Sequence, residues 1–236
     1  MPNLSALGVA ALLSLSPTPA AVVAEGQCEV LESEVTWGFK ESFRSYISGA
    51  IALGQWTTSG DVGYDTPAFI FSGGEGAIAP DRRSGTVAFG GELLFEGHGG
   101  ILRTSLSDPT LTLQGPRQAT LAFDVTGDTM DMVSVSARDV EFVALEWSAG
   151  DERVDVATGE WVVSGAQATL TASGSEAFGT YPEGELFDPV DLRLLVTPSC
   201  LTGDALNPWW IAGGVLGVAV AGGVAVWVTA RARKSP

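Results

Sequence analysis

The chain is poor in the residues that most catalytic and metal-binding sites use. Its 236 residues include one histidine, two cysteines and three tyrosines, and 12 basic residues stand against 28 acidic ones. A formal net charge of −16 makes nucleic acid an unsuitable partner, because binding to a phosphate backbone requires a positive surface. The sequence contains no Cys-x-x-Cys-His motif, which excludes covalent c-type haem.

Enzymatic motifs are also missing. The sequence has no Gly-x-Ser-x-Gly elbow and no phosphate-binding Gly-x-x-x-x-Gly-Lys loop. A zinc site built from two distant cysteines and His98 would lack a compact ligand spacing. Acidic residues are so abundant that a carboxylate pair carries no information about glycosidase chemistry. These absences leave few catalytic arrangements open, and a surface hydrolase with His98 as its base is a weak alternative because no nucleophile motif accompanies it.

Charge is absent from the first 24 residues. This uncharged segment ends at Ala24 with Val22 two positions earlier, which resembles a small-residue signal-peptidase site, although no basic residue precedes Lys40. Pro17 and Pro19 argue against a buried helix here. We expect residues 1–24 to be a signal peptide and residues 25–204 to be one exported domain. That domain holds all 28 acids and nine of the 12 bases, so its net charge is −19.

A second uncharged run, of 22 residues, extends from Trp209 to Ala230 and is followed by Arg231, Arg233 and Lys234. A helix of this length reaches ~33 Å, enough to cross a hydrocarbon core of about 30 Å. The basic residues that follow predict a cytoplasmic C-terminus. We expect residues 205–230 to be a stalk and a single transmembrane helix, and residues 231–236 to be a cytoplasmic tail. The domain would then stand outside the cell membrane.

The two cysteines, Cys28 and Cys200, lie at the two ends of the expected domain. An exported protein with two cysteines has one possible intramolecular disulfide. We expect Cys28 and Cys200 to form this disulfide; the alternative is a pair of free thiols on flexible segments.

Hydrophobic patterning between the cysteines favours an all-β fold. Apolar runs with a period of two, separated by Gly, Asp and Pro, predict strands at residues 86–95, 101–106, 110–113, 120–125, 140–147, 161–163, 168–172 and 191–196. We expect an antiparallel sandwich or barrel-like sheet. One short helix is predicted at residues 38–48, because Phe39, Phe43 and Ile47 recur every four residues and Gly49 follows.

Several ordered motifs resemble the Htaa domain, a family of cell-surface haem-binding proteins of actinobacteria. They are VTWGFKESFRSYI at residues 35–47, GTVAF at 85–89, FEGHGG at 95–100, LSDP at 106–109, YPEG at 181–184 and FDPV at 187–190. The resemblance spans residues 31–197, the whole expected domain. It also implies a β-rich fold with a short helix, in agreement with the hydrophobic pattern.

The resemblance implies a protein that binds ferric haem non-covalently and is not an enzyme. Tyr46 matches the family's axial tyrosine ligand, His98 its assisting histidine and Tyr181 its second tyrosine, while Thr180 stands where an aromatic residue is expected. Tyrosine is an established haem ligand, and ferric iron favours the phenolate. The family implies capture or relay of haem for iron acquisition, with haemoglobin, other surface haem-binding proteins and a haem transporter as partners.

Two points stay open from the sequence. Lys40, Arg44 and Arg103 are the bases nearest to these motifs and could balance the haem propionates, but each could equally be an ordinary solvated base. The alternative function is a cell-surface adhesion or carbohydrate-binding β domain without a working haem site.

Overall fold

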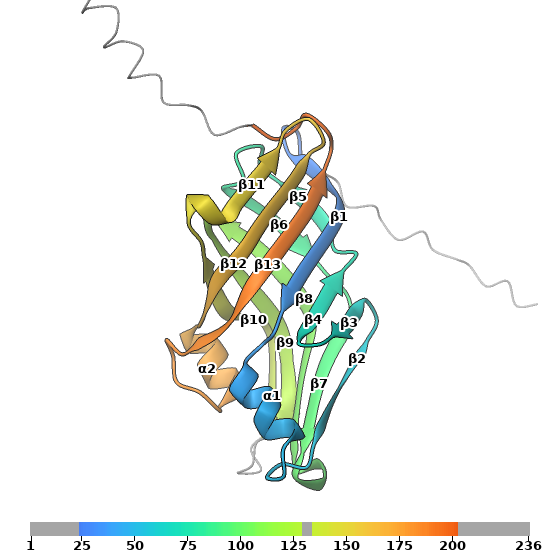
Figure 1. The fold of residues 1–236 in the computed structure, drawn as a ribbon, viewed down its shortest axis with the longest axis vertical. Helices are drawn as coiled ribbons and strands as arrows, with labels where there is room; N and C mark the ends of the chain where they lie inside the picture. Colours follow the sequence, from blue (N-terminus) through green and yellow to red (C-terminus); the bar gives the residue numbers. More distant parts are fainter. Residues whose placement is uncertain (1–23, 129–133, 203–236) are drawn as a thin grey trace, which may run out of the picture.

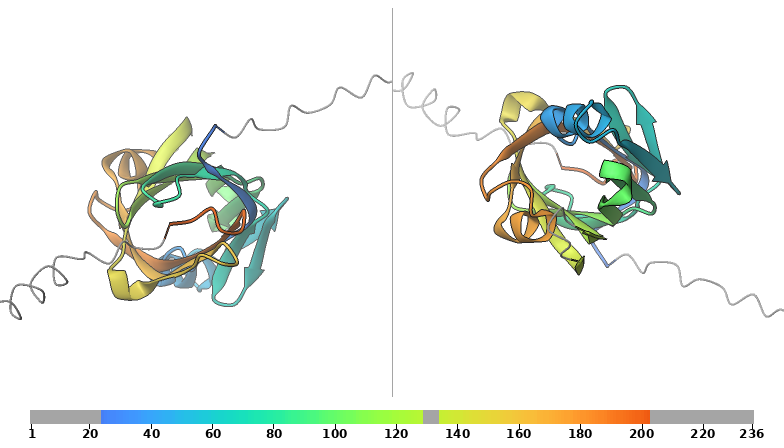
Figure 2. Two further views of the ribbon diagram at one scale, coloured as in Figure 1. Left: turned by 90° about the horizontal axis from the view of Figure 1, so that it is seen from above. Right: turned by 90° about the horizontal axis from the view of Figure 1, so that it is seen from below.

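The strands form one antiparallel sheet that closes on itself. The computed structural model describes residues 24–128 and 134–202. In this part of the chain, strand β1 (Cys28–Trp37) pairs with β13 (Leu186–Val196) on one side and with β5 (Glu75–Ile78) on the other. From β13 the pairing continues through β12 (Glu160–Leu170), β10 (Ser134–Glu146), β9 (Gln118–Asp128), β8 (Leu102–Gln114) and β6 (Ser84–Ala88) and returns to β5 (Figures 1 and 2). The expected all-β class is confirmed.

The remaining elements follow in chain order. The strands are β2 (Gln55–Ser59), β3 (Val62–Asp65), β4 (Ala68–Ser72), β7 (Glu92–Gly97) and β11 (Glu152–Asp155). The helices are α1 (Glu41–Ser48) and α2 (Ala172–Phe178), with the short 3₁₀ turns η1 (His98–Gly100) and η2 (Ala149–Asp151).

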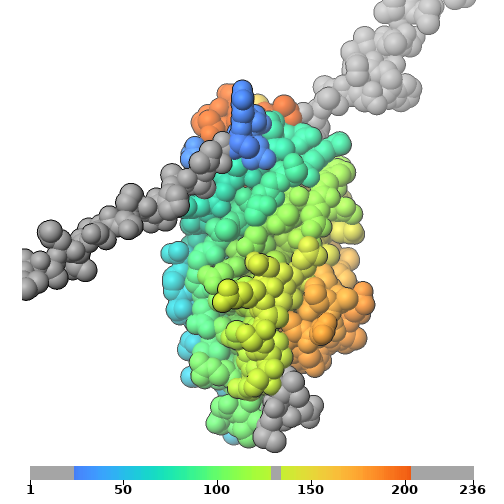
Figure 3. All heavy atoms as spheres, turned by 180° about the vertical axis from the view of Figure 1, so that it is seen from behind, coloured from blue at the N-terminus to red at the C-terminus, as the bar shows by residue number. Residues whose placement is uncertain are grey.

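Near α1, four additional strands extend the closed sheet. The second half of β1 pairs with β4, and the first half of β8 pairs with β7. Strand β3 extends the first pair and β2 extends the second. Helices α1 and α2 and the turn η1 surround this end of the closed sheet, which we call the site end (Figure 2). Seen from behind, β9 and β10 form much of the surface and α2 lies along its side (Figure 3).

Several expected strand limits were wrong, because turn-forming residues sit inside strands as bulges. Asp108 and Pro109 separate two expected strands, but β8 runs through them with a shift of register between Ser107 and Thr110. Gly165 adopts a φ of +71° within β12, where the register also shifts. Bulges of this kind bend a strand without ending it. By contrast, the expected strand 86–95 is broken between Ala88 and Glu92.

The expectation of one short helix was also wrong, since the described residues contain α2 as well as α1. The segment 168–172 was expected to be a strand, but β12 ends at Leu170. The Thr171 hydroxyl accepts a hydrogen bond of 2.9 Å from the Gly174 amide and caps α2. Gly179 ends the helix in a left-handed conformation with a φ of +66°. Both are common signals of helix ends.

An aromatic cluster fills the interior beneath the two helices. Phe39 lies at its centre and is fully buried, with ring centroids 5.0 Å from Trp37, 5.0 Å from Phe95 and 5.1 Å from Phe187. Phe43 of α1 packs edge-on against Phe178 of α2 at 5.1 Å. This cluster joins α1, α2 and the sheet, and it therefore forms the floor of the site end.

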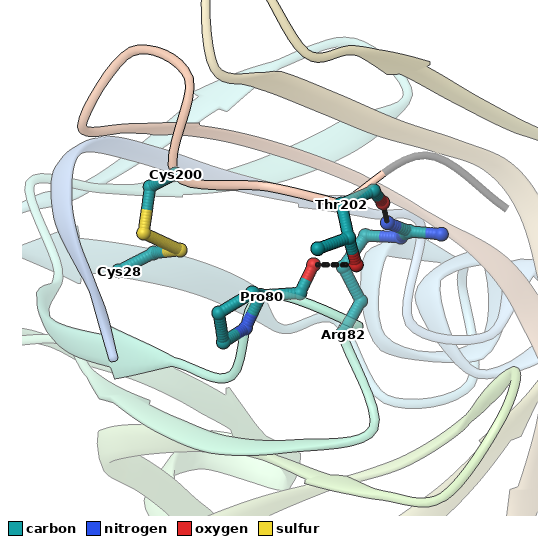
Figure 4. The surroundings of a disulfide bond; sticks show 5 residues. All are labelled: Cys28, Pro80, Arg82, Cys200 and Thr202. Carbon is teal, nitrogen blue, oxygen red and sulfur yellow. Dashed lines mark hydrogen bonds between the residues drawn. A yellow bond between two sulfur atoms is a disulfide. The ribbon is translucent and has the colours of Figure 1, made fainter. Parts of the chain in front are cut away.

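The opposite end carries the expected disulfide. Cys28 and Cys200, 172 positions apart, are bonded to each other (Figure 4). Beside them the buried Arg82 pairs with Glu152 at 2.9 Å and donates a hydrogen bond of 2.6 Å to the Thr202 carbonyl. These contacts fix the segment that follows β13 to the start of β1. We call this the disulfide end.

The expected signal peptide, transmembrane helix and cytoplasmic tail lie outside the described residues. Within residues 24–128 and 134–202, no helix combines the length and the hydrophobicity needed to span a membrane.

Candidate ligand-binding site

Helix α1 presents Tyr46 at the site end. Phe43 and Ile47 are buried on the side of the helix that faces the aromatic cluster, while Tyr46 is half-buried beside them. The Tyr46 ring packs against Phe43 with centroids 6.3 Å apart. Neighbouring positions on a helix are turned by about 100° from one another, so Tyr46 lies at the border between core and surface.

The turn η1 brings His98 to the same place. Its amide donates a hydrogen bond of 2.7 Å to the Ala52 carbonyl in the loop after α1, and its backbone has a φ of +53°. The loop and β7 approach closely at Gly54, where a Cβ atom would lie 2.0 Å from the Glu96 carbonyl oxygen. Glycine is therefore required at this position. The result is a fixed distance between the η1 turn and the C-terminal end of α1.

Tyr46 and His98 form a direct hydrogen bond. The Tyr46 hydroxyl and His98 Nε2 are 2.5 Å apart, although 52 positions separate them in the chain, and both side chains are half-buried. Beyond His98 the backbone is open, since no atom lies within 4 Å of a Cβ built on Gly99 or Gly100. A phenol held by an imidazole can exchange its proton with the ring nitrogen and offer its oxygen to a Lewis acid.

Tyr181 lies near this pair and is connected to Tyr46 through a shared contact with Phe43. Its ring stacks on Phe178 at 6.1 Å and meets Phe43 at 6.5 Å, so that Tyr46 and Tyr181 share Phe43 as a neighbour. The Tyr181 hydroxyl lies 3.4 Å from Ser42 Oγ, one helical turn before Tyr46. Ser42 was not among the expected site residues; its spacing of four from Tyr46 on a predicted helix was the available signal.

Asp188 of β13 holds the start of α1, and sequence reasoning gave it no role. Its Oδ1 accepts a hydrogen bond of 3.0 Å from the Glu41 amide, and its Oδ2 receives one of 2.9 Å from Arg44. Lys40, the N-cap residue of α1, makes no side-chain capping bond of its own. An eight-residue helix is too short to be stable alone. Asp188 therefore stabilises the helix that carries Tyr46.

Replacing Asp188 by alanine is expected to raise the exchange rate of the α1 amides by about tenfold, because a lost N-terminal cap costs ~1 kcal/mol and an ion pair is lost with it. Hydrogen exchange measured by mass spectrometry tests this. Asp191→Ala is the matched control, since Asp191 also lies on β13 and accepts a backbone amide, from Gly165 at 2.7 Å. Equal protection of α1 in both variants would contradict the assigned role of Asp188.

Lys40 connects α1 to the segment that contains Tyr181. Its Nζ pairs with Glu185 at 2.7 Å, donates to the Leu186 carbonyl at 2.7 Å and lies 5.0 Å from the centroid of the Tyr181 ring. Thr180, next to this tyrosine, is exposed and its hydroxyl donates to the Phe178 carbonyl at 3.3 Å. Among the described residues, no group of three or more His, Cys, Asp or Glu side chains is arranged to hold a metal ion.

Fold and site together define a closed antiparallel β domain with a tyrosine–histidine pair at one open end. The chain belongs to the Htaa family, whose sequence model matches residues 32–193. No curated protein matches the chain.

Solved structures support this assignment. The C-terminal domain of HtaA from Corynebacterium glutamicum is 32% identical, with a TM-score of 0.65 over 72% of this chain and 99% of that domain. The N-terminal domain of the same protein is 25% identical, with a TM-score of 0.60 over 71% and 98%. HtaB from C. glutamicum, described as a heme binding protein, shares the fold at 24% identity and a TM-score of 0.54 over 72% and 97%.

Proposed function

We propose that this chain binds ferric haem at the site end, with Tyr46 as the axial ligand of the iron, and that it captures or relays haem for iron acquisition. The observation that carries the proposal is the 2.5 Å hydrogen bond between Tyr46 and His98 at an open end of an Htaa-family domain. The function is binding, so we propose no catalytic residue.

The residues present suit this ligand chemically. A phenolate oxygen is a hard donor that favours Fe(III), and tyrosine is an established axial ligand of haem. The Tyr46 hydroxyl must lose its proton when it binds iron, and His98 Nε2 is placed to accept it. Returning that proton would weaken the bond to iron. The pair therefore supports reversible binding, which a protein that passes its ligand onward requires.

Apolar surfaces around the pair suit a large flat macrocycle. The buried Phe43 and Phe178 support the half-buried ring of Tyr181, which we propose packs near the porphyrin. Ile51, Leu53 and Ile101 lie in the loops beside His98 with 74%, 80% and 53% of their surfaces exposed. Exposed large apolar side chains gathered at one place are typical of binding surfaces.

The position of the site agrees with a membrane-anchored extracellular protein. The described chain ends at Thr202 in the disulfide end, opposite α1 (Figure 1). We propose that residues 1–24 direct export, that residues 205–230 anchor the chain and that residues 231–236 remain in the cytoplasm. The site end would then point away from the anchor, toward haem donors such as haemoglobin or other surface haem-binding proteins. A haem transporter would be the acceptor.

Titration of the purified chain with haemin tests the function. We expect a stoichiometric complex with a ferric Soret band. His98→Ala should weaken binding by about tenfold without abolishing it, because the ligand stays while its hydrogen-bond partner is lost.

His98→Asn is the matched control, since asparagine tolerates the positive φ of this position. Equal losses in both variants would assign the effect to the imidazole and not to the backbone. A protein that stays colourless and cannot be reconstituted would refute the proposed function.

A further inference from the structure

Each basic side chain in the described part of the chain is already paired with an acid. The nine pairs are Lys40–Glu185, Arg44–Asp188, Arg82–Glu152, Arg83–Asp81, Arg103–Glu96, Arg117–Glu152, Arg138–Asp124, Arg153–Glu160 and Arg193–Glu160. The other three bases of the sequence lie at positions 231–234. Residues 25–204 carry a net charge of −19, so acids remain in excess after this pairing.

Two of these pairs hold α1 in place, and a third joins β8 to β7. Asp188 binds Arg44 through one oxygen and caps α1 through the other. Lys40 is 14% exposed, and its Nζ bonds both Glu185 and the Leu186 carbonyl. Arg103 is 54% exposed but lies opposite Glu96 on the neighbouring strand and binds it at 3.2 Å. A new anion at Arg44 or Lys40 would have to displace a carboxylate that holds α1 in place.

Ferric haem with both propionates ionised carries one net negative charge. The iron contributes three positive charges, whereas the porphyrin ring contributes two negative charges and the propionates contribute two more. Building on the haem-binding function proposed above, we propose that the propionates of haem project into solvent without an ion pair to this domain. The site then recognises the iron and the apolar macrocycle, and its ligand class includes ferric porphyrins whose acidic side chains are neutralised.

Without such an ion pair, added salt should raise the affinity for haemin, whereas salt weakens binding that depends on ion pairs. A domain of charge −19 repels haemin, and the repulsion is screened over a Debye length that falls from about 30 Å at 0.01 M to about 8 Å at 0.15 M ionic strength. Haemin should therefore bind more tightly as salt increases, by about fivefold over this range. A porphyrin with esterified propionates carries one net positive charge and should show the opposite slope.

The test compares haemin with haemin dimethyl ester on the purified full chain, in one detergent buffer, at about 10 mM and about 150 mM NaCl. We expect the ester to bind at least as tightly as haemin and the two salt slopes to have opposite signs. Arg103→Gln should change haemin affinity by less than about threefold, as should the matched control Arg138→Gln, whose side chain is 88% exposed.

The inference would be overturned if the protein bound haemin about tenfold more tightly than the ester and lost this preference in Arg103→Gln or Lys40→Gln. Such a result would mean that a propionate forms an ion pair with that base. Haemin affinity that falls with salt would overturn it as well. If neither porphyrin bound, the haem-binding function itself would fail together with the inference, and this result is distinct from a preference for one of the two ligands.

Discussion

Replacing Tyr46 by phenylalanine is expected to remove the axial bond to iron and to lower the affinity for haemin by at least about 100-fold. Loss of a partner that merely orients a metal ligand costs about 10- to 100-fold, and this variant removes the proposed ligand itself. Phenylalanine keeps the aromatic ring that packs against Phe43, so the fold should be retained. Haemin titration, with thermal unfolding of the ligand-free variant alongside it, measures both effects.

Two other tyrosines provide comparison. Tyr64→Phe is the matched control, because Tyr64 of β3 packs against Trp56 and Phe69 and lies outside the proposed site. It should bind haemin as the unchanged protein does. Tyr181→Ala should lose on the order of 1 kcal/mol through its ring contacts. If Tyr46→Phe kept the ferric spectrum while His98→Ala lost it, the histidine would be the ligand and the assigned roles would be wrong.

Removal of the disulfide is the second large effect. In the double variant Cys28→Ala/Cys200→Ser, the free energy of unfolding should fall by up to about 5 kcal/mol, the loop-closure entropy for cysteines 172 positions apart. Alanine is chosen at position 28 because Cys28 is fully buried and a hydroxyl there would lack solvent. Denaturant unfolding under non-reducing conditions gives the difference.

The same variant should keep the site intact. Cys28 and the end of β1 near α1 are nine residues apart along an extended strand, which places them about 30 Å from each other. Haemin affinity at a temperature where both forms are folded should therefore change by less than about twofold. An unchanged free energy of unfolding would mean that the bridge does not constrain the unfolded chain, and a large loss of affinity would mean that the two ends are coupled.

Local patterns predicted the elements that depend on local chemistry. The spacing of Phe39, Phe43 and Ile47 with Gly49 after them indicated a helix at residues 38–48, and the structure has α1 at Glu41–Ser48. Helix α2 was missed because the apolar run before Thr171 has the composition of a strand. The capping pattern of Thr171 and Gly179 was present in the sequence, and it was the better guide.

Closure of the sheet could not be predicted, since it depends on partners far apart in the chain. Strand β1 pairs with β13 in a register that matches Val35 with Leu192, and it also pairs with β5. Alternation of apolar residues predicts which face of a strand is buried, but it does not predict which strand lies beside it. A sandwich and a closed sheet therefore share one sequence pattern.

The sequence likewise indicated some residues of the candidate site and missed others. The family resemblance indicated Tyr46, His98 and Tyr181, and the structure brings the first two into direct contact. The roles of Asp188 and Ser42 could not be read from the sequence, because Asp188 reaches α1 from a position 147 residues beyond Glu41. The haem-binding roles of Tyr46, His98 and Tyr181 stay predictions.

The resonance Raman spectrum of the ferric haem complex tests the central claim most directly. Excitation into the phenolate-to-iron charge-transfer band enhances the vibrations of a tyrosine bound to iron. We predict these vibrations in the unchanged protein and in His98→Asn, and their loss in Tyr46→Phe. A ferric complex without tyrosinate vibrations, or one that keeps them in Tyr46→Phe, would contradict the assignment of Tyr46 as the iron ligand.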